Sequence, residues 1–318
     1  DFFKRILDTL LKSDAISRLA KISDASKNLI TEIFEKIKKV EIANIASVEL
    51  SHQKNENTYS EEVKKLLTKF KTEEEHIVIM IDEFPQTIEN IRNKEGEQAA
   101  LKFLQLNREH RQNANNNIQF IYTGSIGLPN VVKKVSSPII IADINIVDIP
   151  PFTREEANKL TTSVLDNYEV KYSAQSIDYL LDKISWFIPF HLQLAIQEII
   201  DVHEGNDTTV DTNDIDNAFR QMLNVRNNTY FEHYYQRLEI AFAKEEYNFV
   251  IDILNYVAEH IYIKRDKIKA IADSHQLENH QQAIDTLEFD GYISLNDNLS
   301  QYYFNSSIIQ NWWKKNEL

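Results

Sequence analysis

The spacing of apolar residues along the chain changes from a helical period to short uninterrupted runs and then back to a helical period. Residues 2–11 carry apolar side chains on one helix face, and Asp1 before them suits a helix N-cap. Further amphipathic helices are predicted at 26–39 and 60–70. The polar stretch SHQKNENTYS at 51–60 indicates a loop between them.

Two short runs rich in β-branched residues interrupt the helical pattern: IVIMI at 77–81 and IQFIYTG at 118–124. A helical stretch around 95–112 separates them. Strand–helix–strand alternation of this kind predicts a parallel sheet with helices on its faces. The runs PIII at 138–141 and INIVDI at 144–149 predict two more strands.

Helical periodicity returns after Pro150 and Pro151, which end the sheet region. Thr153 and Glu156 have the spacing of a capping box, and they start a helical region that runs to about residue 235. In the last part, three helices are predicted at 245–260, 265–273 and 280–289. A hairpin at 291–307 follows, with its turn near Asn296–Asn298.

These patterns divide the chain into an α/β part at 1–150, a helical part at 151–235 and a helical part with a hairpin at 236–318. A length of 318 residues suits two or three domains, and 42% apolar with 26% charged residues is a globular composition. No run approaches the ~18 consecutive apolar residues of a membrane span. No secretion signal opens the sequence, and no cysteine occurs, which favours a cytoplasmic location.

Two adjacent carboxylates follow the first predicted strand, in HIVIMIDEFPQ at 76–86. If 77–81 is a central parallel strand, its carboxyl end opens onto a ligand crevice, and Asp82 lies at that edge. A carboxylate there can hold a phosphate-bound Mg²⁺, and Glu83 can orient or deprotonate the attacking water. An apolar run also ends in charge wherever a chain simply meets solvent, so the pair alone does not decide between these interpretations.

The second predicted strand ends in Thr123-Gly124-Ser125. If the two strands are neighbours, both hydroxyls lie at the same sheet edge as Asp82, where they can contact a γ-phosphate or the attacking water. Gly124 and Gly127 are two of the 5 glycines in the chain, and their clustering indicates a close backbone approach or a positive φ. An ordinary strand-to-helix turn explains the same residues without any ligand.

The order of these motifs resembles that of AAA-type P-loop ATPases of the signal-transduction (STAND) branch in bacteria and archaea. The resemblance covers most of the chain from about residue 60 onward, and its segments are IVIMIDEFP, LNREHRQ, IQFIYTGSIGL, IVDIPPFTREEANKL, ISWFIPFHLQLAIQEI and YYFNSSIIQNWWKK. It implies an α/β fold: a partial P-loop core with a parallel sheet and flanking helices, then a helical lid and a winged-helix domain. It also implies a switch in which ATP binding closes the lid and hydrolysis releases it.

The resemblance also implies roles for individual residues. Asp82 matches the Walker B acid that is associated with Mg²⁺, and Glu83 matches the catalytic glutamate. Thr123 or Ser125 matches the sensor position at the end of the second strand. Pro189 matches the proline of the lid turn that faces the nucleotide.

Three further residues are candidates with an open alternative each. His191 follows the lid proline and could reach the base or a phosphate, or it could be a histidine on a helix surface. Arg108 and Arg111 lie on the predicted helix between the two strands. One of them could act in trans as an arginine finger, or both could belong to a solvated helix face.

The sequence departs from the family at two places. No G-x-x-x-x-G-K-[ST] phosphate loop occurs in the 318 residues. The family places this loop ahead of the helix that follows Asp1, and the first residue is not Met, so we expect the loop to lie upstream in a longer gene product. Without it the 318 residues should bind ATP and Mg²⁺ poorly. Phe187 and Ile188 stand where the family usually has glycine before Pro189.

The charge of the chain argues against nucleic acid as its partner. The net charge is −14, and the part at 236–318 holds eight Lys/Arg and thirteen Asp/Glu. The helix at 280–289, in the position of a recognition helix, has no Lys or Arg. The basic cluster KRDKIK at 264–269 fits one solvated helix face. Separately from the charge pattern, Trp312 and Trp313 are expected in the core of this part.

The function predicted from the sequence is therefore an ATP-binding and ATP-hydrolysing switch that uses ATP and Mg²⁺ and contacts a protein partner or further copies of itself. Two alternatives stay open. The first is an ATPase-derived interaction scaffold that no longer hydrolyses ATP, which the missing phosphate loop and the altered lid turn favour. The second is a winged-helix regulator that binds DNA. The sequence does not distinguish ATP from GTP.

Overall fold

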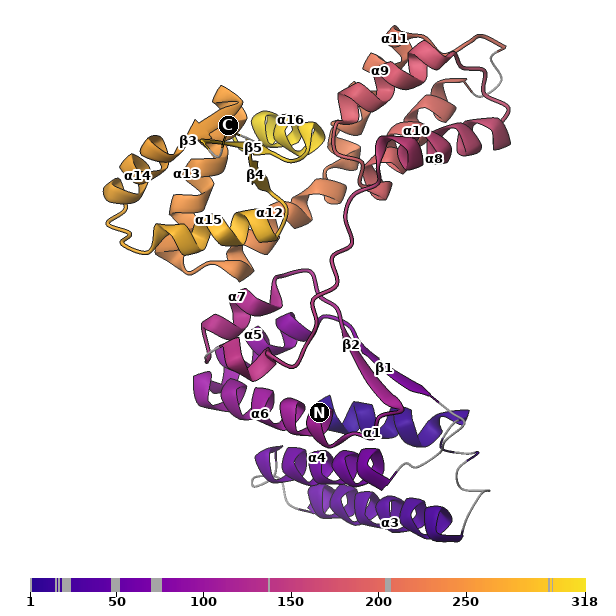
Figure 1. Cartoon of the computed structure of the whole chain (residues 1–318), viewed down its shortest axis with the longest axis vertical. Coiled ribbons are helices and arrows are strands. Elements are labelled where there is room, and N and C mark those ends of the chain that lie inside the picture. The colour runs from indigo at the N-terminus through magenta and orange to yellow at the C-terminus, as the bar shows by residue number, and fades with distance from the viewer. Residues whose placement is uncertain are drawn as a thin grey trace. The chain divides into compact units, whose positions relative to one another are not determined.

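The computed structural model of the chain describes residues 2–14, 16, 18, 24–46, 52–69, 76–136, 138–203, 207–296, 298 and 300–318. The chain forms two compact units, Asp1–Asn145 (unit 1) and Ile146–Leu318 (unit 2), and each has its own hydrophobic core (Figure 1). The fold is a mostly helical α/β structure with a small parallel sheet. The expected N-cap Asp1 lies outside the described residues, and so does part of the expected turn at 296–298.

Unit 1 consists of helices around a short sheet (Figure 1). Its described elements are α1 (Phe2–Lys12), α3 (Asp24–Ala46), α4 (His52–Lys69), β1 (Ile77–Ile81), α5 (Phe84–Glu95), α6 (Glu97–Asn113), β2 (Ile118–Tyr122), α7 (Leu128–Lys133) and the 3₁₀ helix η1 (Pro138–Ile141).

The apolar stripe at the start of the chain forms a helix as predicted. Phe3, Leu7 and Leu10 of α1 recur at helical spacing and are buried. Their side chains belong to the core of unit 1 together with Val63 and Leu66 of α4. This burial, more than the intrinsic preference of the residues, stabilises α1.

The loop predicted at 51–60 is wrong, because most of this stretch belongs to α4, which begins at His52. The apolar stripe of α4 starts at Tyr59, so the earlier turns carry no apolar residue that reveals a helix. Gln, Lys and Glu tolerate the helical conformation well, and the packed stripe that follows stabilises the helix to which these residues belong.

β1 and β2 form a two-stranded parallel sheet, which confirms the strand–helix–strand prediction. The register pairs Ile77 with Ile118 and Ile81 with Tyr122. Both strands therefore end at the same edge of the sheet, side by side in Figure 1.

The two faces of this sheet have different surroundings. Ile79 and Ile81 point to the core of unit 1 and are 9% exposed each. On the opposite face Val78, Met80 and Ile121 are 48%, 71% and 43% exposed. Parallel sheets ordinarily have both faces covered, so the open face is unusual for this architecture.

The two further strands predicted after β2 are wrong. PIII at 138–141 is the 3₁₀ helix η1, and INIVDI at 144–149 contains no strand. Ile146, Val147 and Ile149 are 65%, 81% and 92% exposed. β-branched residues favour strands where a neighbouring strand pairs and packs with them, and no described strand does so here.

Unit 2 is mostly helical and contains a three-stranded antiparallel sheet with strand order β3-β5-β4. Its described elements are α8 (Arg154–Asn167), α9 (Ala174–Ile184), α10 (Pro189–His203), α11 (Thr212–Met222), η2 (Val225–Asn227), α12 (Thr229–Ala241), α13 (Lys244–His260), β3 (Tyr262–Lys264), α14 (Arg265–Ser274), α15 (His280–Phe289), β4 (Ile293–Leu295), β5 (Gln301–Phe304) and α16 (Ser307–Asn316).

Several local predictions for unit 2 are confirmed. Thr153 and Glu156 form a reciprocal capping box at the start of α8. The hairpin is present as β4 and β5. Trp312 and Trp313 are buried in the core of the unit. In the part of the chain that the structure describes, no helix is long and apolar enough to cross a membrane.

Candidate functional site

The carboxyl ends of β1 and β2 are joined by main-chain hydrogen bonds that continue beyond the last strand residues. The N–H of Thr123 donates to the carbonyl of Ile81 at 3.0 Å, and the N–H of Phe84 donates to the carbonyl of Thr123 at 3.0 Å. Since β1 ends at Ile81 and α5 begins at Phe84, Asp82 and Glu83 alone connect strand and helix. The ladder therefore fixes both carboxylates beside the segment that follows β2.

Asp82 is paired with the first hydroxyl after β2. Thr123 Oγ1 donates to Asp82 Oδ1 at 2.5 Å, and the N–H of Glu83 donates to the same oxygen at 3.0 Å. Asp82 and Thr123 are both exposed, so this carboxylate is accessible from solvent. An accessible carboxylate fixed by two donors is suited to hold a hard cation such as Mg²⁺.

Glu83 is paired with the second hydroxyl. Its Oε2 accepts hydrogen bonds from Ser125 Oγ at 2.9 Å and from the N–H of Ser125 at 3.1 Å. The backbone of Glu83 is left-handed, with φ 50° and ψ 38°. This conformation is uncommon for a residue with a side chain and costs on the order of 1 kcal/mol, and such strain clusters at functional sites.

Gly124 lets the two strand ends approach each other. A Cβ at this position would lie 2.5 Å from Cδ and 2.8 Å from Cγ of Pro85. The φ of Gly124 is not positive. Of the two explanations expected for this glycine, close approach is therefore the correct one.

The donor set at this edge fits a cation that arrives with phosphate. Among the described residues, no group of three or more His, Asp or Glu side chains could hold a metal ion by itself. Mg²⁺ in phosphate-transfer sites is bound by one or two carboxylates together with phosphate oxygens and water. Asp82 therefore fits the part of one such carboxylate ligand.

Arg111 is part of unit 1 rather than a free surface cation. Its Nε and Nη2 donate to both carboxylate oxygens of Asp143, at 2.9 Å and 3.0 Å, and its guanidinium lies 5.5 Å from the ring centre of Tyr122. Burial lowers the pKa of Arg111 and is the largest single effect, but the hydrogen bonds and charges of Asp143 and Tyr122 together outweigh it, so the pKa is raised. The solvated helix face predicted for this residue is wrong, since its side chain is 8% exposed.

Arg108, the other arginine of this helix, has a buried Nε with no hydrogen-bond partner among the described residues. It contributes to lowering the pKa of Asp143, although burial opposes the shift and Arg111 has the larger effect. Both arginines thus lower the pKa of the same carboxyl group. A role in trans would require Arg111 to leave that pair.

Pro189 and His191 start α10 in unit 2. Pro189 is exposed, and the turn before it uses Ser185 at φ 57° where glycine is the common choice. His191 is 0% exposed, so the alternative of a helix-surface histidine is wrong. The expected nucleotide contact of both residues stays a prediction.

The ring of His191 is surrounded by aromatic side chains, those of Trp186, Phe190, Phe231 and Tyr234. Its Nδ1 lies 3.4 Å from Ser306 Oγ, and its Nε2 has no hydrogen-bond partner among the described residues. Burial, with a smaller effect of the nearby His233, lowers the pKa of His191 to about 4. The neutral imidazole therefore acts as a packing residue of unit 2.

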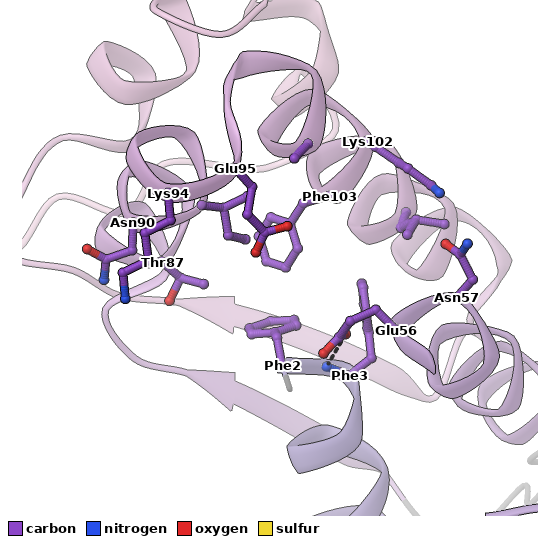
Figure 2. Close-up of a pocket in the computed structure, with 13 residues that line it drawn as sticks. Phe2, Phe3, Glu56, Asn57, Thr87, Asn90, Lys94, Glu95, Lys102 and Phe103 are labelled. Atoms are coloured by element: carbon purple, nitrogen blue, oxygen red, sulfur yellow. Dashed lines mark hydrogen bonds between the residues drawn. The ribbon is translucent and has the colours of Figure 1, made fainter. Parts of the chain in front are cut away.

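Unit 1 also contains a cavity of about 390 Å³ that the sequence did not indicate. Figure 2 shows the rings of Phe2 and Phe103 beside it, with their centroids 4.8 Å apart in an edge-to-face arrangement. Its other lining residues include Glu56, Thr87, Asn90, Lys94, Glu95 and Lys102. With Phe2 and Phe103, the lining residues come from α1, α4 and the consecutive helices α5 and α6, so no single local pattern could reveal them. Asp82, Glu83, Thr123 and Ser125 do not line the cavity.

Comparisons with known proteins agree with this architecture at the level of the fold. No protein-family model matches the chain, and no curated protein matches its sequence. A Walker-type ATPase of Pyrococcus abyssi is similar in structure over 83% of this chain and 68% of its own, with a TM-score of 0.50 and 14% sequence identity. This likeness shows a shared fold, so the chain has an ATPase-like fold.

Two further solved structures are more distant. The ORC2 protein of Aeropyrum pernix, in its ADPNP–ADP complexes, is similar over 81% of this chain and 70% of its own, with a TM-score of 0.46 and 12% identity. RuvB of Thermotoga maritima is similar over 77% and 71%, with a TM-score of 0.37 and 11% identity. Their TM-scores are too low to support an argument about this chain.

Proposed function

We propose that the protein is an ATP-binding and ATP-hydrolysing molecular switch of the STAND type. The observation that carries this proposal is the pairing of Asp82 with Thr123 and of Glu83 with Ser125 at the shared carboxyl edge of β1 and β2. Ligands of open α/β sheets bind at this edge. An ATPase-like fold supports the same conclusion.

Each of the four side chains has a role in this proposal. A Mg²⁺–nucleotide complex, when bound, supplies the phosphorus that water attacks. Asp82 holds the Mg²⁺ through a carboxylate oxygen, and Thr123 orients that carboxylate. Glu83 accepts the proton of the attacking water, while Ser125 holds its side chain in position.

A phosphate loop has to complete this site, and the sheet leaves one face free for the segment that carries it. The 318 residues contain no G-x-x-x-x-G-K-[ST], yet one face of the parallel sheet leaves Val78, Met80 and Ile121 exposed. Covered faces are the rule for parallel sheets. We propose that a segment outside the 318 residues brings the loop and covers this face.

Unit 2 supplies the moving and interacting parts of the proposed switch. Residues 151–235 form the helical lid, and Pro189 and His191 lie at the start of its helix α10. Residues 236–318 form a winged helix, with α15 as its third helix and β4 and β5 as its wing. ATP binding closes the lid and hydrolysis releases it, and the winged helix contacts a protein partner.

ATP turnover tests the role of Glu83. The protein is expressed from its full reading frame, and Glu83→Gln is expected to lower kcat by a factor of about 10²–10⁴ because the water loses its general base. Glu245→Gln, an exposed residue in the first turn of α13, is the matched control and should keep wild-type turnover. Equal turnover in wild type and Glu83→Gln would refute the assignment.

Measurements on the same full-length protein distinguish the ATP-hydrolysing switch from the second candidate function, an interaction scaffold that does not hydrolyse ATP. The absence of a phosphate loop from the 318 residues favours this alternative. Binding of a fluorescent ATP analogue without turnover in the full-length wild type would support a switch that has lost catalysis. Neither binding nor turnover would support the scaffold.

A DNA-binding regulator is a weaker candidate. The helix α15, in the position of a recognition helix, carries Asp285 and Glu288 and neither Lys nor Arg. Both carboxylates would repel phosphates.

A further inference from the structure

One surface of unit 2 combines a strand edge, exposed apolar side chains and a cluster of cations. It runs from the end of α13 through β3 into the first turns of α14 (Figure 1). We call it the β3–α14 patch; its exposed apolar and cationic side chains are those of Ile261, Tyr262, Lys264, Arg265, Lys267 and Lys269, and Asp266 is exposed among them.

The strand in this patch lies at the edge of its sheet. The strand order is β3-β5-β4, and within the described part of the chain no other strand pairs with the outer side of β3. Ile263 is 0% exposed and anchors β3 in the core, while Tyr262 and Lys264 on either side of it point outward and are exposed. An edge strand presents main-chain N–H and C=O groups that another extended chain can pair with.

Ile261, just before β3, has a conformation that needs an explanation. Its φ is 74°, and its side chain is 64% exposed. A positive φ is a strained outlier for a β-branched residue, and glycine would adopt it without strain. The isoleucine side chain therefore neither favours the backbone conformation of this turn nor packs in the core. Contact with a partner gives this side chain a role, together with the neighbouring Tyr262, which is 38% exposed.

The cations of the patch stand out in an acidic molecule. Half of the eight Lys/Arg of residues 236–318 fall in the patch, and Asp266 is the one acid within 261–269. Among the described residues none of the four cations forms an ion pair, although Lys267 lies 5.1 Å from the ring centre of Tyr256. In contrast, Arg154 and Lys183 of the same unit pair with carboxylates. Exposed cations without carboxylate partners attract an anionic ligand.

We propose that the β3–α14 patch binds an extended acidic segment of a partner protein. The segment adds to the edge of β3 through main-chain hydrogen bonds, and its carboxylates meet Lys264 and Arg265. Its apolar side chains cover Ile261 and Tyr262. A peptide fits better than nucleic acid, because the strand edge matches a peptide backbone and because the net charge of −14 opposes a long polyanion.

A synthetic peptide of alternating Glu and Val, labelled with fluorescein, is the first probe. Fluorescence anisotropy with the 318-residue chain is expected to show saturable binding that weakens as salt rises from 20 to about 150 mM, since charge attraction contributes. A peptide of alternating Lys and Val should not bind. A peptide with proline in place of each Val should lose at least tenfold in affinity, because proline cannot donate to a strand ladder. Equal binding of all three peptides, or none by the Glu–Val peptide, overturns the proposal.

Two charge reversals at equivalent helix positions distinguish peptide binding by the patch from attraction by the net charge of the chain. Arg265 is the first residue of α14 and Lys244 is the first residue of α13, and both are exposed. Glutamate is favourable at either helix start, so both variants should fold. Arg265→Glu is expected to weaken peptide binding at least tenfold, whereas Lys244→Glu should stay within twofold of wild type. Equal losses would assign the binding to net charge alone.

Ile261→Gly gives a readout that a merely structural role would not produce. Glycine relieves the positive φ, so the thermal midpoint should rise. Loss of the apolar contact should at the same time weaken the Glu–Val peptide about threefold or more. A variant that is more stable and binds equally well would remove Ile261 from the proposed surface.

Other occupants of the patch are outcomes of the same assay. A labelled 20-nucleotide DNA, single-stranded or duplex, is tested in the same way. If it binds more tightly than the peptide and Arg265→Glu weakens its binding, the ligand of the patch is nucleic acid. Self-association that Arg265→Glu abolishes in sedimentation would identify the acidic segment as part of a second copy of this chain. Either result overturns the proposed partner protein.

Discussion

At Gly124 the absence of a single carbon atom decides whether the strand ends of the proposed site can meet. A Cβ would lie 2.5 Å from Cδ of Pro85, well inside contact distance. Thr123 and Ser125 flank this glycine and donate to the two carboxylates. The geometry of the site therefore depends on a residue that has no chemistry of its own.

Gly124→Ala is expected to destabilise unit 1 by about 1–3 kcal/mol, because the added methyl group overpacks against Pro85. Urea unfolding followed by circular dichroism measures the loss. Pro85→Ala in the same background should recover most of it, because the ring that clashes is gone. Additive effects of the two substitutions would show that the contact is not the cause.

A second prediction at the residue scale concerns His191. Its pKa is lowered to about 4, mainly by burial and less by His233. Above pH 6.5 the side chain is neutral in the folded and unfolded chain, so it adds no pH dependence. As the pH falls from about 6.5 to about 4, the unfolded chain takes up a proton that the folded chain does not, and stability is lost.

This sign predicts that the free energy of unfolding of unit 2 falls by ~3 kcal/mol over that range, at about 1.4 kcal/mol per pKa unit. His191→Gln should flatten the slope whatever its effect on absolute stability. The measurement is a series of denaturant unfolding curves between pH 7 and pH 4. An unchanged slope in the variant would contradict the buried neutral histidine.

At the scale of elements, a buried carboxylate connects the two helices that follow the strand ends. Glu89 of α5 is 0% exposed, and it accepts from Arg92 Nε at 2.5 Å and from Lys134 Nζ at 2.9 Å. Lys134 directly follows α7. Because α5 starts after Glu83 and α7 starts soon after Ser125, this connection helps to hold the site in register.

Glu89→Ala is expected to cost about 3–5 kcal/mol, because its removal leaves the partly buried cations of Arg92 and Lys134 without their carboxylate. Chemical unfolding measures this loss. Glu155→Ala is the control: Glu155 and Lys159 form an i,i+4 pair whose side chains are 79% and 73% exposed, so little stability should be lost. A loss as small as that of the control would mean that Glu89 does not connect the helices.

Each element that the sequence missed or misassigned has its own physical reason. β3 has three residues between two helices, too few to show a period. η1 and the exposed run at 144–149 are apolar and β-branched, but a strand needs a neighbour that the described residues do not provide. The helix α4 was hidden because its first turns are polar all round. Long amphipathic helices such as α13 were visible because one face has to be buried.

At the scale of the whole molecule, two separate cores support the different roles that we propose for the two units. The core of unit 1 supports the strand ends with their carboxylates, and the core of unit 2 supports α10 and the three-stranded sheet. The net charge of −14 lies entirely in unit 2, which holds 14 Lys/Arg and 28 Asp/Glu; it disfavours nucleic acid as a partner of this unit and makes the basic β3–α14 patch an exception. The likeness to a Walker-type ATPase at 14% identity shows that two sequences with few residues in common share this fold.

The sequence by itself determined the two parallel strands, the helices with one apolar face, the capping box at Thr153 and the carboxylates at the end of β1, because periodicity and local hydrogen bonding are encoded in neighbouring residues. Tertiary structure alone decided which hydroxyl meets which carboxylate, that Gly124 lies against Pro85, and that His191 is buried. These contacts join residues far apart in the chain. Only packing brings such residues together, so no local pattern could specify them.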